Sequence, residues 1–211
     1  MTRETELIRL GAHLTGWLEK SRAQTVLGKS ASYIPELAHV PANTLGIAVL
    51  DGSGREVTAG DCGVLFTMQS ISKVFTLLLA LMDQGEDGVF RKVGMEPTGD
   101  NFNSMLKLEL VEPGKPFNPL INAGAIAVSS LIVGETREEK TERILDFFRK
   151  LAGDPKLGVN EAVYRSEKAT AHRNRSLAYF LKDNLVLGEE DDVEDVLDVY
   201  FRHCSVEVTC R

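Results

Sequence analysis

The order of secondary-structure signals predicts an α+β fold, in which a small antiparallel sheet is joined to a helical subdomain. Three observations indicate this fold. An amphipathic helical pattern over residues 3–21 is followed by a β-hairpin pattern at residues 45–59. A long apolar run then begins after Lys73, and from there helical patterns follow one another to the end of the chain. With 211 residues, 43% of them hydrophobic, the chain can bury the core of one globular domain or two small ones.

The first third of the chain is expected to supply the sheet. Residues 45–50 are an apolar strand, Asp51-Gly52-Ser53-Gly54 is a turn, and residues 56–59 are the returning strand. A helix over residues 70–84 follows, and its apolar run predicts that it is buried nearly all round. That run is much shorter than the roughly 20 residues that a membrane-spanning helix needs.

The rest of the chain is expected to be helical. Residues 96–100 read as a turn, and Pro119 opens a helix of small residues over 121–133. Further helices are predicted at 136–152, 160–166, 176–185 and 193–206. The acidic run at 189–192 is typical of a solvated helix start, where carboxylates favour the helix dipole. We therefore place residues 1–75 in the sheet domain and residues 76–211 in a mostly helical subdomain.

Composition and charge exclude several classes of function. The formal net charge is −7 without any Lys/Arg cluster, which argues against a nucleic-acid or anionic-membrane surface. The first residues are polar, unlike a signal peptide, and three cysteines (Cys62, Cys204 and Cys210) suit a reducing cytosol. His203 stands beside Cys204, but the histidines are scattered and no phosphate-binding loop is visible. We therefore expect no metal, no cofactor and a cytoplasmic protein.

The strongest chemical signal is Ser70 followed three residues later by Lys73. On a helix, residues with this spacing lie on one face. A serine hydroxyl becomes a useful nucleophile only when a neighbouring base takes its proton. A lysine can be that base if burial and the helix dipole lower its pKa. The free N–H groups of the first turn could also stabilise an oxyanion.

Spacing alone leaves a second interpretation open. Ser70 could be a helix N-cap and Lys73 an ordinary surface lysine. The Ser-x-x-Lys pattern also occurs at Ser104 and Lys107, where no comparable apolar run follows, and we interpret that copy as chance.

Six separate motifs, in order and at matching spacing, make the chain resemble the serine-dependent glutaminase family. They are Tyr33-Ile34-Pro35-Glu36-Leu37-Ala38, Gln69-Ser70-Ile71-Ser72-Lys73-Val74-Phe75, Glu96-Pro97-Thr98-Gly99 with Phe102-Asn103-Ser104, Asn118 to Ile126, Ser166-Glu167 with Arg173-Asn174, and Tyr200-Phe201-Arg202-His203-Cys204-Ser205. The resemblance runs from about Tyr33 to the last residue. It implies hydrolysis of L-glutamine to L-glutamate and ammonia, a β-lactamase/DD-peptidase-like fold and a homo-oligomer.

The resemblance also implies catalytic roles. Ser70 would attack the side-chain amide carbon of glutamine, and Lys73 would take the serine proton and pass it to the leaving amine. The backbone N–H of Ser70 would be one oxyanion donor. Tyr200 would position the substrate or relay a proton near Lys73.

Four further residues would bind the substrate, and without the resemblance three of them have an ordinary structural interpretation. Tyr33 would lie beside the substrate, or else be a core aromatic residue. Asn122 would contact the zwitterionic end of the amino acid, or else cap a helix. Glu167 and Asn174 would contact the α-amino group and the α-carboxylate. Taken alone, Glu167 reads as a surface charge.

The sequence ends directly after the Tyr200 motif, whereas the family continues with further sheet strands, another catalytic tyrosine and a Gly-rich strand. We therefore expect a truncated glutaminase whose own activity is open. One alternative is another acyl-serine hydrolase of this fold, although no Ser-Asp-Asn or Lys-Thr-Gly element and no secretory signal is seen. The other is a non-catalytic chain that joins intact subunits.

Overall fold

The computed structural model describes residues 3–99, 101–102, 104–105, 108–109 and 114–211, with side chains from Glu6 onward in the first helix. Contacts divide the chain into two compact units. The first comprises Met1–Phe66 and Val208–Arg211, and the second comprises Thr67–Glu207. This division falls before the helix predicted over residues 70–84, whereas the sequence placed it after residue 75, and the domain boundary stays a prediction. Asp100, Asn103 and Lys107, which belong to predicted features, lie outside the described residues.

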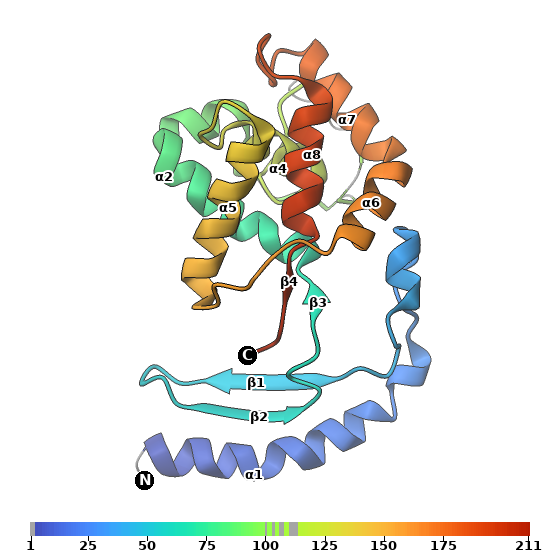
Figure 1. The fold of residues 1–211 in the computed structure, drawn as a ribbon, viewed down its shortest axis with the longest axis vertical. Coiled ribbons are helices and arrows are strands. Elements are labelled where there is room, and N and C mark those ends of the chain that lie inside the picture. The colour runs from blue at the N-terminus through green and yellow to red at the C-terminus, as the bar shows by residue number, and fades with distance from the viewer. Residues whose placement is uncertain (1–2, 100, 103, 106–107, 110–113) are drawn as a thin grey trace. The chain divides into compact units, whose positions relative to one another are not determined.

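The first unit is one long helix packed on a β-hairpin. Helix α1 (Arg3–Arg22) lies along strands β1 (Gly46–Leu50) and β2 (Glu56–Gly60), which pair antiparallel with Gly46 opposite Gly60 (Figure 1). Two short 3₁₀ turns, η1 (Thr25–Leu27) and η2 (Pro35–His39), connect them. The core of this unit is centred on Leu14, Leu18 and Ala59, whereas Ile8 and Trp17 of the same helix are exposed. The hairpin prediction is thus confirmed to within a residue at each strand end.

The turn of the hairpin is stabilised by its own first residue. Oδ1 of Asp51 accepts hydrogen bonds from the backbone N–H groups of Ser53 (2.9 Å) and Arg55 (3.0 Å). The pKa of Asp51 is lowered most by a hydrogen bond from the Ser53 hydroxyl to the ionised carboxylate. The backbone bonds lower it further. Gly54 supplies the left-handed backbone, with φ of 81°.

The second unit is a helical assembly. A 3₁₀ turn, η3 (Gln69–Ile71), leads directly into α2. The helices are α2 (Ser72–Lys92), α4 (Asn122–Ser130), α5 (Arg137–Ala152), α6 (Glu161–Thr170), α7 (His172–Asp183) and α8 (Val193–Cys204). Strands β3 (Phe66–Thr67) and β4 (Glu207–Val208) pair where the chain passes between the units. Together with the hairpin, these elements confirm the α+β class.

Helix α8 is the centre of the helical unit. It contacts α4, α5, α6 and α7, and Figure 1 shows α5 on one side of it with α6 and α7 on the other. Leu197 and Phe201 are completely buried at this centre. The helix begins where the acidic run predicted, because Asp192 is its N-cap and accepts a hydrogen bond from the N–H of Asp195 (2.9 Å).

The expectation that the helix after Ser70, α2, is buried nearly all round is wrong. Val74, Leu78 and Met82 share one face of α2 and are exposed, from 45% for Leu78 to 66% for Met82. Lys73, Thr76 and Ala80 instead lie on the face of α2 that is buried in the core. An apolar run shows only which residues are present. In the structure α2 packs against α4 and α8, so only the face toward these helices is buried. The helix also starts later than expected, at Ser72, and continues to Lys92 across a non-helical Gly85 (φ 69°).

Two glycines in helices should respond oppositely to alanine. A Cβ on Gly124 in α4 would lie 1.9 Å from the Asn118 carbonyl oxygen, whereas one on Gly16 in α1 would meet nothing within 4 Å. We expect Gly124→Ala to destabilise the protein by about 3 kcal/mol and Gly16→Ala to stabilise it by about 0.5–1 kcal/mol. Urea denaturation of both variants measures the difference. Equal stability for Gly124→Ala and wild type would contradict the close approach of the chain to α4.

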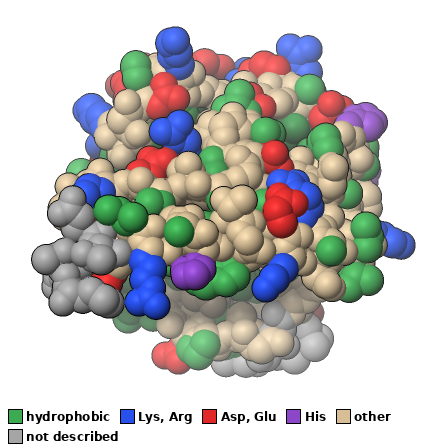
Figure 2. Space-filling model, turned by 90° about the horizontal axis from the view of Figure 1, so that it is seen from below, with side chains coloured by type: hydrophobic (Ala, Val, Ile, Leu, Met, Phe, Trp, Pro, Cys, Tyr) green, Lys and Arg blue, Asp and Glu red, His purple; other side chains and the backbone are tan. Residues whose placement is uncertain are grey.

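Charge is dispersed on the face shown in Figure 2. Among the described side chains visible there, acidic and basic groups are interspersed and neither sign forms a broad patch. Within the described chain, no helix is both long enough and apolar enough to traverse a bilayer.

Candidate active site

Ser70 lies in a turn with an unusual backbone. It is the middle residue of η3 and is exposed. The preceding residue, Gln69, has φ of 48°, a left-handed conformation that is uncommon for residues other than glycine. Its side-chain amide donates to Thr67 Oγ1 (3.1 Å) and to the Cys204 carbonyl (3.4 Å). Such strained residues often mark functional sites.

The turn is attached to the end of α8 at a second point. The N–H of Met68 donates to the Val206 carbonyl at 2.8 Å, and the Ser72 hydroxyl donates to the Gln69 carbonyl at 2.7 Å. Contacts on both sides of Gln69 therefore maintain the conformation that presents Ser70.

Lys73 is buried, with only 2% of its surface exposed. Its Nζ donates to Asn122 Oδ1 (2.7 Å) and to the Leu120 carbonyl (3.1 Å). Burial lowers the pKa of Lys73, while the charges of Cys204 and Glu167 act in the opposite direction. A lysine whose neutral form is favoured in this way can accept a proton from a neighbouring hydroxyl.

The partners of Lys73 come from the start of α4. Asn118 Oδ1 accepts from the N–H groups of Leu120 (3.0 Å) and Ile121 (3.2 Å), forming the turn that leads into the helix. Asn122 follows as the first helical residue, and its Nδ2 donates to Asn174 Oδ1 at 3.0 Å. A continuous chain of hydrogen bonds thus connects Lys73 on α2, Asn122 on α4 and Asn174 on α7.

Glu167 is a buried carboxyl group on α6. It is 7% exposed, and its Oε2 makes no hydrogen bond within the described part of the chain. Burial raises the pKa of Glu167 to about 7, against the opposing attraction of Lys73. A buried, unpaired carboxyl oxygen is costly, so it points to a cationic or hydrogen-donating ligand.

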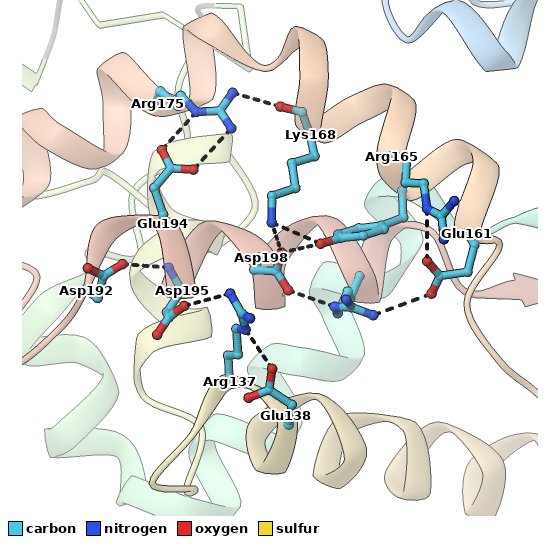
Figure 3. Close-up of polar contacts among 12 residues, drawn as sticks. Arg137, Glu138, Glu161, Arg165, Lys168, Arg175, Asp192, Glu194, Asp195 and Asp198 are labelled. Carbon is cyan, nitrogen blue, oxygen red and sulfur yellow. Dashed lines mark hydrogen bonds and ion pairs between the residues drawn. The ribbon is translucent and has the colours of Figure 1, made fainter.

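The helix that carries Glu167 is anchored to α8 by a buried carboxylate, Asp198 (Figure 3). Asp198 is 1% exposed and accepts hydrogen bonds from Tyr164, Lys168 and, at 2.7 Å, Arg202 Nε. Burial alone would raise the pKa of Asp198, but these bonds outweigh it and lower the pKa. The Arg202 guanidinium also lies 4.3 Å from the Tyr164 ring centre.

A second ion pair anchors α7, the helix that carries Asn174. Arg175 binds both carboxylate oxygens of Glu194 on α8, at 2.9 and 3.1 Å, and donates to the Lys168 carbonyl on α6 at 2.8 Å (Figure 3). Glu167 and Asn174 each stand next to one of these anchoring cations in the sequence. The two ion pairs therefore define where both candidate binding residues lie.

Tyr200, His203 and Cys204 occupy the buried end of α8. The Tyr200 ring meets the His203 ring edge-on, with centres 5.3 Å apart. Burial raises the pKa of Cys204 to about 12, with a further rise caused by Glu167, while hydrogen bonds from Ser72 and Tyr200 act against the shift. Burial also lowers the pKa of His203 to about 3, and Lys73 adds to this effect.

Comparison with known proteins identifies the family of this site. The family model described as Glutaminase matches residues 28–211. The chain belongs to the glutaminase family. A glutaminase from Alkaliphilus metalliredigens is 57% identical over 194 residues, which cover 92% of this chain and 63% of that protein. The chain thus spans less than two thirds of the length of this glutaminase.

Solved glutaminase structures share the fold. A probable glutaminase from Bacillus subtilis has a TM-score of 0.86 at 44% identity, covering 96% of this chain and 61% of that one. A second structure from the same organism, complexed with 6-diazo-5-oxo-L-norleucine, has a TM-score of 0.81 at 42% identity, covering 94% of this chain and 59% of that one. The β-lactamase-like fold expected from the resemblance is confirmed.

The structure of this glutaminase-family chain rules out several structural interpretations. Lys73 is buried, so it is not a surface lysine, and Glu167 is not a surface charge. The N-cap of α4 is Ile121, so Asn122 is not a capping residue. Tyr33 is 66% exposed in the first unit, so it is not a core aromatic residue. For Lys73 and Glu167 the local pattern was ambiguous, and packing between distant segments decided the outcome.

Of the predicted site residues, the structure brings Lys73, Asn122 and Asn174 into one hydrogen-bonded chain, and Glu167 interacts electrostatically with Lys73. Tyr200 is buried on α8 beside His203, and Ser70 is three residues from Lys73 at the turn. Tyr33 lies in the other unit, and its role stays a prediction.

Sequence reasoning missed the buried hydroxyls and the imidazole around this glutaminase-family cluster. Ser72 and Ser129 each lie within hydrogen-bond distance of a ring nitrogen of His203. His203 belongs to the Tyr200 motif, three residues after Tyr200, and this helical spacing was the available signal. Within the described residues, no group of three or more histidine, cysteine or acidic side chains is arranged to hold a metal ion.

Proposed function

We propose that this protein hydrolyses L-glutamine to L-glutamate and ammonia through a γ-glutamyl ester on Ser70. The observation that carries the proposal is a buried lysine with a lowered pKa, Lys73, three residues after an exposed serine in a strained turn. Membership of the glutaminase family supports the choice of an amide substrate.

In the proposed reaction, the neutral amine of Lys73 takes the proton of Ser70 as Oγ attacks the substrate's side-chain amide carbon. The backbone N–H of Ser70 stabilises the developing oxyanion. The Lys73 ammonium then protonates the leaving nitrogen, and ammonia departs. Water hydrolyses the ester with Lys73 again as the base, which restores Ser70. Tyr200 positions the substrate or relays a proton at this end of α8.

The α-amino acid end of glutamine is proposed to bind between α6 and α7. The substrate ammonium pairs with Glu167, whose Oε2 is buried without a protein partner in the described chain. Asn174 accepts from Asn122 through Oδ1, and its Nδ2 is proposed to donate to the substrate carboxylate. Tyr33 is proposed to contact the substrate, as the family resemblance implies. The glutamine analogue in the Bacillus subtilis structure supports an amino acid substrate.

We further propose a homo-oligomer that works in the cytoplasm. Three free cysteines support a reducing compartment. The half-exposed apolar face of α2, formed by Val74, Leu78 and Met82, supports association between chains.

The test is to incubate the purified 211-residue protein with L-glutamine and to quantify glutamate and ammonia. We expect equal amounts of the two products, and a covalent adduct of 6-diazo-5-oxo-L-norleucine that peptide mass spectrometry locates at Ser70. Labelling of Ser70 by a penicillin without release of glutamate would contradict the proposal and favour a β-lactamase or peptidase. D-glutamine is the control, because the α-amino and α-carboxylate contacts are chiral.

A further inference from the structure

His203 is a buried imidazole with a partner at each ring nitrogen. Nδ1 lies 2.8 Å from Ser72 Oγ on α2, and Nε2 lies 3.2 Å from Ser129 Oγ on α4. All three side chains are buried, with His203 2% exposed. The imidazole therefore joins α8 to the two helices that supply Lys73 and Asn122.

The hydrogen-bond geometry favours one arrangement of protons. Each serine hydroxyl carries one proton, and a neutral imidazole carries one N–H. The Ser72 hydroxyl has one proton and three acceptors within reach: the Gln69 carbonyl at 2.7 Å, His203 Nδ1 at 2.8 Å and the weak acceptor Cys204 Sγ at 3.7 Å. The shortest contact is to Gln69, and when the hydroxyl donates there it accepts from Nδ1–H. Nε2 is then the acceptor, and the Ser129 hydroxyl turns to it from its alternative partner, the Ala125 carbonyl at 2.9 Å.

The opposite tautomer would break the shorter hydrogen bond, from the Ser72 hydroxyl to the Gln69 carbonyl. With the proton on Nε2, the Ser72 hydroxyl would have to donate to Nδ1 and leave the Gln69 carbonyl. The bond lost would be the 2.7 Å contact at the turn, whereas the first arrangement gives up only the 2.9 Å bond from Ser129 to Ala125. The Ala125 carbonyl is within α4, where back-bonding by a serine adds little.

The favoured arrangement ends at the nucleophile turn. Its direction runs from Ser129 to His203, to Ser72 and to the carbonyl of Gln69, the residue with φ of 48°. Ser70 follows directly. A left-handed residue other than glycine persists only where its surroundings hold it.

We propose that His203, as the neutral Nδ1–H tautomer, is a positioning residue that holds the Gln69–Ser70 turn through Ser72. This inference rests on the proposed function for its effect on rate, but not for its geometry. His203 touches neither the substrate nor Ser70 in this scheme; it sets the direction of the Ser72 hydroxyl and thereby the orientation of the nucleophile.

The tautomer of His203 can be determined without measuring enzymatic activity. We expect long-range ¹H–¹⁵N spectra of ¹⁵N-histidine-labelled protein at pH 7 to show one histidine with the proton on Nδ1. His203→Gln should remove that signal and so assign it among the four histidines. A proton on Nε2, or a doubly protonated ring, would overturn the proposal even if glutamine is hydrolysed.

Two serine variants test the two ends of the hydrogen-bonded chain Ser129–His203–Ser72, which we call the relay. Ser72→Ala removes the bond to the turn, so we expect kcat to fall about 10–100-fold with KM nearly unchanged, because misplacing a reacting group by about 1 Å costs this much. Ser129→Ala is the matched control, as an equally buried serine on the far side of the ring, and should change kcat less than about threefold. Equal losses in the two variants would overturn the proposal.

Two replacements of the ring test which nitrogen matters. The Nδ2 of His203→Asn can take the place of Nδ1 and donate to Ser72, whereas the amide of His203→Gln reaches only the position of Nε2 near Ser129. Both variants lose ring packing, so a purely structural role predicts similar losses. We expect the asparagine variant to retain at least ten times the kcat of the glutamine variant per folded molecule, a difference within reach of one misplaced group.

A final readout distinguishes failure of this inference from failure of the proposed function. Ser72→Ala should shift the backbone amide resonances of Ser70 and Ile71, whereas Ser129→Ala should leave them in place. If the wild type releases no glutamate, these shifts still test the relay. Unchanged Ser70 and Ile71 resonances in Ser72→Ala would overturn it.

Discussion

Replacement of Ser70 by alanine is expected to lower the rate of glutamine hydrolysis by at least about 10⁴-fold, as removal of a serine nucleophile does in other acyl-serine enzymes. Without Oγ no γ-glutamyl ester can form, and Lys73 has no hydroxyl to activate. Because Ser70 is exposed at the turn, the free energy of unfolding should change by less than about 0.5 kcal/mol. Measuring kcat and urea denaturation on the same preparation separates catalysis from folding.

The chain provides its own control for this experiment. Ser104 begins the second Ser-x-x-Lys pattern, so Ser104→Ala removes the same hydroxyl from the same local motif. We expect that variant to keep at least half of the wild-type kcat. Retention of more than a tenth of the activity in Ser70→Ala, or a comparable loss in Ser104→Ala, would show that Ser70 is not the nucleophile.

Replacement of Glu167 by glutamine is expected to stabilise the protein while weakening substrate binding. Burial raises the pKa of Glu167 to about 7 from its ordinary 4.5. The folded state therefore holds a proton that the unfolded state releases between these values, so wild-type stability falls as pH rises from about 4.5 to 7. A glutamine stays neutral, so the variant should be more stable by about 3 kcal/mol at pH 8 and by almost nothing at pH 4.

Binding should change in the opposite direction. The substrate ammonium would lose a charged partner, a hydrogen bond typically contributing about 1.5–3 kcal/mol, so KM for L-glutamine should rise about 10–100-fold. Greater stability with weaker binding is the pattern of a residue retained for function. Urea denaturation between pH 4 and 8, together with KM, measures both effects.

The difference between wild type and variant isolates Glu167. Lys73 and His203 also have lowered pKa values, but both groups remain in the variant and largely cancel in the comparison. Glu86→Gln, an exposed glutamate on α2, is the control and should change neither stability nor KM. A Glu167→Gln variant with wild-type stability at pH 8 would mean that the carboxylate is ionised at no cost, and an unchanged KM would remove it from the site.

Local signals were sufficient for much of the framework. The Asp51-Gly52-Ser53-Gly54 turn predicted the hairpin because its hydrogen bonds are made among neighbours in sequence. Thr136 marked the start of α5, where its hydroxyl accepts from the N–H of Glu139 (3.2 Å). Asp192 marked the start of α8 for the same reason. Such interactions depend on a few adjacent residues, so they can be predicted from the sequence.

The burial of charged side chains could not be predicted from such local signals. The apolar run of α2 suggested burial on all sides, but Met82 is exposed while Lys73, in the same helix, is buried. Glu167 looks like any helical glutamate until α6 is anchored to α8 through Lys168 and Asp198. Only contacts between residues distant in sequence decide which side of a helix loses its water.

Motifs and local periodicity were enough to predict the family, the hairpin and the order of the helices, and they singled out Ser70 and Lys73 as the candidate pair. The tertiary structure decided how the pair is equipped. It brought Asn122, Asn174 and His203 from three other helices around α2, and it withdrew Lys73 and Glu167 from water. Desolvation and hydrogen bonding across helices shift pKa values and direct protons, and these effects arise only when distant segments pack together.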